Sequence, residues 1–395
     1  MRLFTRYLTF ELAKIFLGTL TGLTLFMLVV GVVQEAHDQG LSFTTILKIL
    51  PYLLPNALRF AVPGTILFAA CNVYGRMSSF NEILAVKSLG ISPLAVLWPA
   101  YILAFVTSLL AVWFNDLAVS WGTYGVKRVL IESAEEIIYS VLRTHGQYSS
   151  DKISINVSRV EGQMMIEPMI IIHPHGNSPP VTVLAKSAEL RSDHEAGEFI
   201  IYLTDSNIEY GDNIVFSHPG TLPHVIPLFE NSETDLRVAR TSQIALRNIR
   251  SAITTQQKII KNFRQSLAAD AAYGMLTGEL SDLATEAWQD RFTTIEHHVH
   301  RLHRLRTEPY RRWANGFSCL FFVLVGAPLA IRMRNSDLMT TFGVCFLPIL
   351  VLYYPLLALA VGRAKCGALP PYSVWLGNVI LCIIGLALMQ RTLRH

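Results

Sequence analysis

Few residues of this chain combine the types and spacing that catalysis requires. The sequence contains no G-x-x-x-x-G-K-[ST] or G-x-G-x-x-G loop to cradle nucleotide phosphates, and no G-x-S-x-G or H-E-x-x-H motif for hydrolysis. We therefore expect this chain not to be an enzyme. If the protein takes part in ATP-driven work, a separate chain must supply the ATPase.

Histidines form the one cluster with a metal-like composition, at His297, His298, His300 and His303. His300 and His303 would share a helix face, but no carboxylate or cysteine lies at a matching spacing. This favours solvated or membrane-proximal helix histidines over zinc ligands. His173 and His175 flank Pro174 in a predicted turn, so we interpret them as loop residues. We expect neither a metal nor a cofactor.

Arg59 is the only charged residue inside a long apolar stretch that covers residues 49–75. It lies 17 positions before Arg76. That separation corresponds to about 25 Å along a helix. If Arg76 marks one edge of a membrane, Arg59 lies near the other edge. Two interpretations remain open: the guanidinium reaches water or lipid headgroups, or it faces an internal cavity and pairs with a substrate phosphate.

Residues 79–93 carry a helix signature between two apolar stretches. Ser79-Phe-Asn-Glu82 has the form of a capping box, in which the serine hydroxyl and the glutamate carboxylate each accept a hydrogen bond from the other's backbone amide. The pattern predicts a short helix that starts there and stops at Gly90. One face of it would carry Phe80, Ile83, Leu84 and Lys87. That face either lies in the bilayer interface or docks into a cytoplasmic partner.

The composition places these residues in a membrane protein. Of 395 residues, 51% are apolar and only 16% are charged, whereas soluble proteins have roughly a quarter charged residues. The first apolar stretch has 19 charge-free residues and no A-x-A site near its end, which favours a span over a cleaved signal peptide. Six stretches are long enough to cross a bilayer: residues 15–33, 49–75, 88–115, 313–331, 338–362 and 366–390.

Charge and cysteine usage exclude two further classes of protein. The net charge is only +4, and the basic residues follow the edges of the apolar stretches. Nucleic-acid binding is therefore disfavoured. Four of the five cysteines lie inside apolar stretches and only Cys366 lies in a short loop. The sequence therefore contains no disulfide framework and no zinc-site spacing.

Basic residues in the short flanks of the six stretches predict the topology, because lysine and arginine favour the cytoplasmic side. The opposite flanks hold only Lys48, Arg363 and Lys365. We therefore expect both termini in the cytoplasm and residues 116–312 outside it. The predicted cytoplasmic flanks hold nine basic residues: Arg2, Arg6, Lys14, Arg76, Lys87, Arg332, Arg334, Arg391 and Arg394.

The predicted external segment has a strand-rich part followed by a helical part. Ile153, Ile155 and Val157 alternate with polar residues, as in a strand with one buried face. Short strands separated by turns such as Pro219-Gly220 predict an antiparallel sandwich or an open barrel. From Thr241 to Thr307 the pattern is helical. Further strand candidates are residues 164–172, 181–190, 199–204, 208–210 and 214–216.

Three spans, a β domain and three further spans resemble the lipopolysaccharide-export permeases of the LptF/LptG (YjgP/YjgQ) family. Residues 53–63, Leu-Leu-Pro-Asn-Ala-Leu-Arg-Phe-Ala-Val-Pro, are similar to the proline-bounded second span of that family. Residues 74–93, with Glu82, Gly90 and Ser92, resemble its coupling-helix signature. Residues 308–332 resemble its fourth span, with an arginine pair before it and Gly-x-Pro-Leu near its end.

The resemblance implies an α-helical membrane protein with six transmembrane helices (3+3). It also implies an inserted extracytoplasmic antiparallel β sandwich, jellyroll-like, and a helical segment. Residues 1–115 would form the first three spans with a coupling helix at 79–90, and residues 116–240 the periplasmic β domain. Residues 241–312 would form the helical segment and residues 313–395 the last three spans. This helical segment is longer than the usual link of the family.

The resemblance also implies a permease subunit of an ATP-driven exporter that extracts lipopolysaccharide from the inner membrane and passes it to a periplasmic bridge protein. Implied partners are a cytoplasmic ABC ATPase dimer, a second permease that is a paralogue or an identical copy, and a single-span accessory subunit. Arg59 would contact the lipid. Seven residues would contact the ATPase: Ser79, Phe80, Glu82, Ile83, Leu84, Lys87 and Gly90.

Two alternatives remain open at this point. The chain could export or assemble another envelope glycolipid, because Gln34, Glu35, His37 and Asp38 replace the basic residue that family members often carry near the end of the first span. It could also be a membrane-anchored sensor or scaffold whose extracytoplasmic domain binds lipid. The coupling-helix signature favours a transporter, since a sensor needs no ATPase contact.

Overall fold

A computed structural model describes residues 2–39, 43–90, 92–123, 125–126, 129, 134–149, 153–172, 181–193, 198–210, 214–227, 241–278, 286–333 and 337–394. The chain forms two compact units. The bundle unit comprises Met1–Leu28, Leu54–Gly122 and Leu236–His395, and the β unit comprises Val29–Leu53 and Thr123–Asp235.

Six helical segments of the described chain are long and apolar enough to cross a membrane, which confirms the six predicted spans. The first four lie in α1 (Arg2–Gln39), α2 (Phe43–Ser79), α4 (Pro93–Leu117) and α9 (Glu286–Arg332). The fifth runs through α10 (Leu338–Pro348), the π-helical turn η4 (Ile349–Tyr353) and α11 (Tyr354–Lys365). The sixth combines the 3-10 turn η5 (Pro371–Trp375) with α12 (Leu376–Arg394).

Helix α9 is the central span of the bundle. In its most apolar window 67% of the residues are buried, against 11% in α1 and 22% in the fifth span. Glycines allow its neighbours to approach closely, because a Cβ at Gly316 would lie 2.2 Å from Cγ2 of Val112 in α4. The exposed apolar side chains of α1 and the fifth span must face lipid or another spanning helix.

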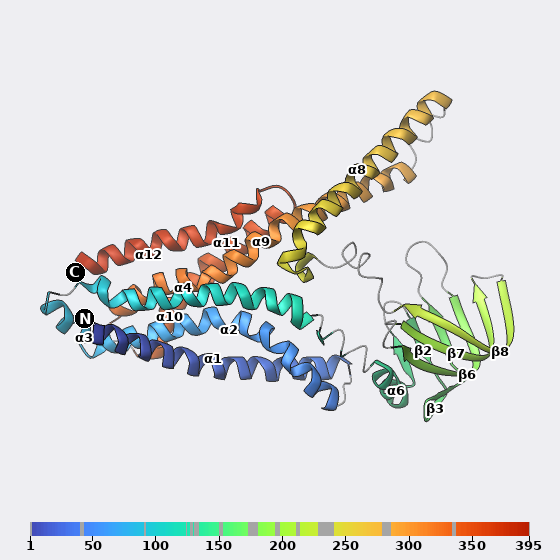
Figure 1. The fold of residues 1–395 in the computed structure, drawn as a ribbon, viewed down its shortest axis with the longest axis horizontal. Helices are drawn as coiled ribbons and strands as arrows, with labels where there is room; N and C mark the ends of the chain where they lie inside the picture. The colour runs from blue at the N-terminus through green and yellow to red at the C-terminus, as the bar shows by residue number, and fades with distance from the viewer. Residues whose placement is uncertain are drawn as a thin grey trace. The chain divides into compact units, whose positions relative to one another are not determined.

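The two ends of the bundle differ. Figure 1 shows both termini and the short helix α3 (Glu82–Ser88) at one end, which we call the terminal end, while α8 (Leu246–Thr277) leaves from the opposite, far end. At the terminal end the Tyr74 hydroxyl donates to the Val96 carbonyl oxygen at 2.9 Å and the Ser78 hydroxyl donates to the Ile331 carbonyl oxygen at 2.5 Å. These bonds fix α2 against α4 and α9.

All described strands of the β unit belong to one antiparallel sheet of eight strands, so the predicted inserted β domain is confirmed. The strand β6 pairs with β7 along one side, and with β5 and then β4 along the other. β2 continues the sheet from β5, β1 from β2, β3 from β4 and β8 from β7. The strands are β1 (Gln147–Ser149), β2 (Ile153–Asn156), β3 (Arg159–Glu161), β4 (Met164–Ile166), β5 (Met169–Ile172), β6 (Val181–Asp193), β7 (Glu198–Tyr210) and β8 (Ile214–Pro227).

Three local features differ from the strands that the sequence predicts. The predicted strand 164–172 is divided in two, because Glu167 has a positive φ of 49° and a proline follows it. The predicted strands 199–204 and 208–210 are one strand, with an irregularity between Thr204 and Ser206. Pro219-Gly220 lies inside β8 instead of in a turn, which an edge strand among the described strands tolerates.

Helix α6 (Ala134–His145) covers the apolar face of this sheet. The Tyr139 hydroxyl donates to the Gln163 carbonyl oxygen at 2.6 Å and accepts from the Leu190 amide at 2.9 Å, so it joins the helix to two parts of the sheet. The core around it is aliphatic and includes Ile138, Leu142, Ile155, Met165, Ile170, Val183, Leu190, Ile201 and Leu203.

The helical part predicted for residues 241–307 forms a hairpin. A 3-10 turn, η2 (Thr241–Gln243), precedes α8, and α8 packs against the first half of α9. Gly278 ends α8 with a φ of +79°, a left-handed conformation that glycine adopts without strain. α9 then returns to the bundle and continues without interruption as the fourth span.

Candidate functional site

The short helix α3 begins three residues later than the sequence predicts. Helix α2 extends to Ser79, whose hydroxyl donates to the Gly75 carbonyl oxygen one turn earlier at 3.0 Å. Asn81 adopts a left-handed conformation, φ 60°, and makes no side-chain cap, and α3 starts at Glu82. The predicted capping box of Ser79 and Glu82 is therefore wrong. Gly90 ends the segment as predicted, with a φ of +74° and its amide bonded to the Lys87 carbonyl oxygen.

The predicted face of this helix is divided between the bundle and the surface. Ile83 is 5% exposed and belongs to the core of the bundle, and the Lys87 ammonium donates to the Thr392 carbonyl oxygen at 3.3 Å. Phe80, in contrast, is 71% exposed and Leu84 is 54% exposed. The helix is thus attached to the bundle through Ile83 and Lys87, whereas Leu84 of α3 and Phe80 of the preceding turn are exposed.

Glu82 is the acidic residue of the first turn of α3 and is exposed. A carboxylate at this position interacts favourably with the positive end of the helix dipole. Its negative charge therefore lies next to the exposed Phe80 and Leu84. Together these side chains form a surface of mixed character, apolar with one anion, at the terminal end of the bundle.

A second feature lies towards the far end of the bundle, where Arg59 lines a cavity of about 280 Å³. Its guanidinium donates to Asn115 Oδ1 at 3.5 Å and lies 4.5 Å from the ring centre of Phe60. The structure thus places Arg59 at a cavity, and its pairing with a substrate phosphate stays a prediction. The other lining residues are Pro63, Ala111, Arg311, Asn315, Gly316, Ser318, Tyr353, Tyr354 and Leu357.

Two further arginines beside this cavity have strong partners within the bundle unit. Arg311 makes two hydrogen bonds to the Glu308 carboxylate, at 2.6 and 2.7 Å. Arg312 is fully buried and donates to Asp116 at 3.1 Å and to the carbonyl oxygen of Ile244 at 2.6 Å. Three arginines and two carboxylates leave one positive charge in excess, and Arg59 has the weakest of these hydrogen bonds. Arg59 is therefore the cation best placed to accept an anionic ligand.

The partners within this cluster of charged residues are only partly encoded in local sequence patterns. The pair of Glu308 and Arg311 has the spacing i, i+3 of a helical ion pair, and that spacing could have been recognised. Asn115 lies 56 positions from Arg59, and Asp116 lies 196 positions from Arg312. No local period links residues at such separations.

In the predicted histidine cluster, His298 packs against a glutamine of α8. His298 Nδ1 lies 3.0 Å from Nε2 of the buried Gln256, which also donates to the His298 carbonyl oxygen at 3.1 Å. Across the part of the chain that the structure describes, no three His, Cys, Asp or Glu side chains come together as a metal site would require. His173 and His175 lie outside the described residues.

The comparison with known families agrees with this arrangement of spans and β domain. The model of the family described as lipopolysaccharide export system permease LptF/LptG matches residues 6–391. The chain belongs to the LptF/LptG family. As a family member it is a multi-pass inner-membrane permease of a multi-component lipopolysaccharide export system, and not an enzyme. No curated protein matches the chain at a significant level.

Proposed function

We propose that this LptF/LptG permease is one half of an ATP-driven exporter that extracts lipopolysaccharide from the inner membrane and delivers it to a periplasmic bridge protein. The terminal end of the bundle is its cytoplasmic end. The nine-to-three distribution of basic residues in the short flanks supports this orientation. The β unit and the α8–α9 hairpin are then periplasmic. With this orientation, residues 1–115 and 313–395 form the two sets of three spans. Residues 116–240 form the periplasmic β domain, and residues 241–312 form the periplasmic helical segment.

The observation that carries the proposal is that α3 is attached to the bundle on one side and is exposed on the other. Ile83 and Lys87 join the helix to the core and to α12, while Phe80, Glu82 and Leu84 point out of the bundle. A helix held in this way transmits a push on its outer side to the spans behind it. Since the sequence has no nucleotide-binding loop, the push comes from a separate cytoplasmic ABC ATPase dimer.

The cavity at Arg59 is the proposed contact for the cargo. Its excess positive charge and its hydrogen-bonding residues, among them Asn115 and Asn315, suit a phosphorylated headgroup. The cavity also has apolar walls at Pro63 and Leu357. A headgroup phosphate there would pair with the one arginine whose internal hydrogen bonding is weak.

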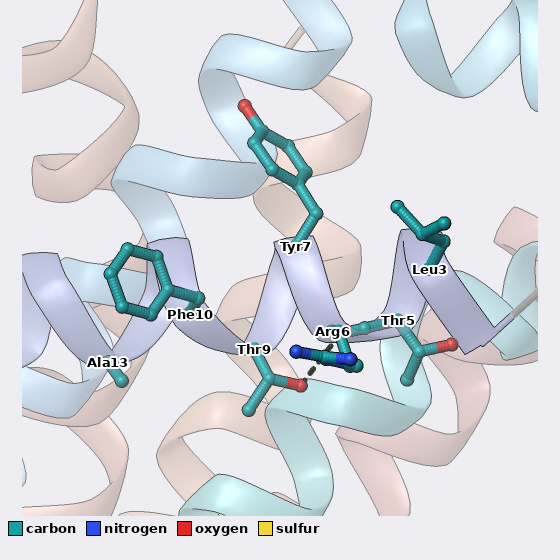
Figure 2. Close-up of a pocket in the computed structure, with 7 residues that line it drawn as sticks. All are labelled: Leu3, Thr5, Arg6, Tyr7, Thr9, Phe10 and Ala13. Carbon is teal, nitrogen blue, oxygen red and sulfur yellow. Dashed lines mark hydrogen bonds between the residues drawn. The ribbon is translucent and has the colours of Figure 1, made fainter.

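The least buried spans, α1 and α10 to α11, are the proposed contacts for a second permease, a paralogue or an identical copy, and for a single-span accessory subunit. Figure 2 shows the residues of α1 that line a groove at the terminal end, among them Tyr7 and Phe10. Both side chains are exposed. Phe10 is 70% exposed. The unpaired side of β8, at the edge of the described sheet, is the proposed contact for the bridge protein.

Purification of the permease from its own membranes, followed by mass spectrometry of bound proteins and lipids, tests the proposal. We expect an ABC ATPase, a second permease and a phosphorylated glycolipid. Recovery of a different envelope glycolipid would replace lipopolysaccharide as the cargo and keep the exporter. Recovery of lipid without any ATPase would support the sensor or scaffold instead.

A further inference from the structure

The α8–α9 hairpin extends far from the membrane-spanning part of the bundle. Of the 47 residues of α9, 27 precede the apolar stretch that begins at Trp313. They correspond to about 40 Å of helix at about 1.5 Å per residue. Figure 1 shows α8 beside this part of α9, away from the spans. The hairpin is therefore a projecting arm and not a membrane element.

Only one side of α8 is covered by α9. The buried residues of α8 are Ile249, Ala252, Gln256, Ile260 and Leu267. Five buried side chains among 32 residues leave most of the helix surface uncovered. A pair of helices with this little burial has room for a third helix along its side.

The uncovered surface of α8 carries two groups of basic residues, one at Arg247 and Arg250 and one from Lys258 to Arg264. Residues 246–269 contain five basic residues and no Asp or Glu, and all five basic side chains are exposed. At 100° per residue they lie within about 60° of Lys261 around the helix. In the sequence that follows, residues 270–296 contain six acidic residues and only one basic residue. The five basic residues are Arg247, Arg250, Lys258, Lys261 and Arg264.

A groove of about 340 Å³ runs along the same side of the hairpin. Ile260 and Ala268 of α8 and Leu302 of α9 supply its apolar surface, and Lys261 and Arg264 supply two cations. Gln257 and Gln265 complete the lining. An apolar floor with positive walls matches a ligand that is apolar on one side and acidic on its flanks.

We infer that this groove binds an acidic amphipathic helix of a partner protein, which packs on α8 and α9 as a third helix. The shape of the charge distribution favours a helix over a lipid headgroup. From Arg247 to Arg264 the cations extend over 17 positions, or about 26 Å of helix. A phosphate needs cations that converge on one point, whereas a helix with acidic residues every three or four positions meets a line of cations. The inference rests on the hairpin alone and is independent of the cargo and of the ATPase contact.

A synthetic peptide tests this inference on the full chain in lipid nanodiscs. The probe is a helical peptide of about 20 residues with a leucine seam flanked by glutamates, and its counterpart carries lysines in place of the glutamates. We expect the acidic peptide to bind, the basic one not to bind, and the binding to weaken between about 0.05 M and about 0.5 M salt. Binding of both peptides alike, or of neither, would overturn the inference.

Two matched double variants distinguish direct contact in the groove from the effect of the net charge of the protein. Lys261→Gln with Arg264→Gln and Asn262→Glu with Ser266→Glu each lower the net charge by two, but only the first pair lines the groove. All four positions are exposed, so both variants should fold. We expect the first variant to lose binding by about tenfold and the second to keep it. Equal losses in both would contradict a docking site in the groove.

Photocrosslinkers placed at Gln257 and Gln265 identify the natural occupant in cells, with Asn262 as the control position outside the groove. The expected product is a protein segment with apolar residues three or four apart and flanking acidic residues. A lipid adduct, a segment without that pattern, or equal capture at Asn262 would overturn the inference. Export defects at Arg59 or Glu82 would not affect these outcomes, so the two proposals fail separately.

Discussion

The ammonium group of Lys87 in α3 donates a hydrogen bond to the backbone carbonyl oxygen of Thr392 in α12, at 3.3 Å. This bond joins the short helix to the last span, 305 positions later in the chain. Ile83, one turn before Lys87, belongs to the core that contains residues of α2, α4 and α9. A displacement of α3 would therefore act on spans from both the first three and the last three of the bundle. This is the property that a coupling helix needs.

Changes at Glu82 test the proposed ATPase contact. Because Glu82 makes no cap to Ser79, Glu82→Gln should leave the folded bundle intact and remove only the anion. We expect Glu82→Gln to reduce lipid-stimulated ATP hydrolysis by about tenfold, the effect of losing one charge-assisted hydrogen bond. Glu82→Arg should reduce it further, and a compensating acidic change on the ATPase should restore part of the activity. ATP hydrolysis and copurification of the ATPase are the measurements.

If Glu82→Arg binds the ATPase and hydrolyses ATP like the parent protein, the carboxylate has no part in the contact. The coupling function would then depend on the apolar residues of α3 alone.

Two neighbouring residues of α3 allow stability and coupling to be measured separately. Ile83 is 5% exposed and Leu84 is 54% exposed. Ile83→Ala should destabilise the purified permease by about 2 kcal/mol or more, because it leaves a cavity in the core. Leu84→Ala should leave the thermal midpoint nearly unchanged and weaken copurification of the ATPase. Normal copurification with Leu84→Ala would indicate that this side of α3 is not the interface.

The spans and the β domain could be predicted from the sequence because their signals are local. A bilayer requires about 20 apolar residues in a row, and a half-buried strand requires alternation, as in Ile153 to Val157. The start of α3 could not be predicted in this way. Ser79 has the residue type of a cap, but its hydroxyl is bonded to Gly75 within a helix that continues past the predicted boundary. Whether α2 stops before Ser79 depends on packing at the end of the bundle, which the motif does not encode.

The cavity at Arg59 was only partly predictable for a related reason. Its depth in the span follows from the distance to Arg76 along one helix. Its neighbours Asn115, Arg311 and Tyr353 come from three other helices. Contacts between side chains so distant in sequence depend on how the spans pack.

The pKa of Tyr139 in the β unit predicts an alkaline limit to the stability of this domain. Burial raises the pKa of Tyr139, because the phenolate loses solvation there. The folded state therefore keeps its proton above pH of about 10, where a tyrosine in an unfolded chain begins to lose it. The stabilisation is complete below that pH and is lost as the pH rises towards the folded pKa.

Hydrogen exchange of β6, whose Leu190 amide donates to the Tyr139 hydroxyl, is the measurement for this effect. We expect exchange to accelerate above pH of about 10 by more than the intrinsic rate increases. Tyr139→Phe should lower the free energy of unfolding by about 1–3 kcal/mol at neutral pH, because the Leu190 amide and the Gln163 carbonyl oxygen lose their partner. It should also reduce the additional alkaline acceleration. An unchanged alkaline profile in Tyr139→Phe would assign the effect to other groups.

The last prediction concerns the proposed cargo site at Arg59. Arg59→Ala should lower crosslinking of lipopolysaccharide to the permease by about tenfold or more, since a hydrogen bond between charged groups contributes about 1.5–3 kcal/mol. Assembly with the partners should not change, because within the described residues the hydrogen bond that Arg59 makes is the long one to Asn115. Arg59→Lys should keep the charge and recover part of the crosslinking. Arg363→Ala is the matched control, since this exposed arginine of α11 does not line the cavity. If Arg59→Ala exports and crosslinks lipid like the control, the guanidinium serves only to reach water or lipid headgroups at the edge of the membrane, and the cargo site must be sought elsewhere in the bundle.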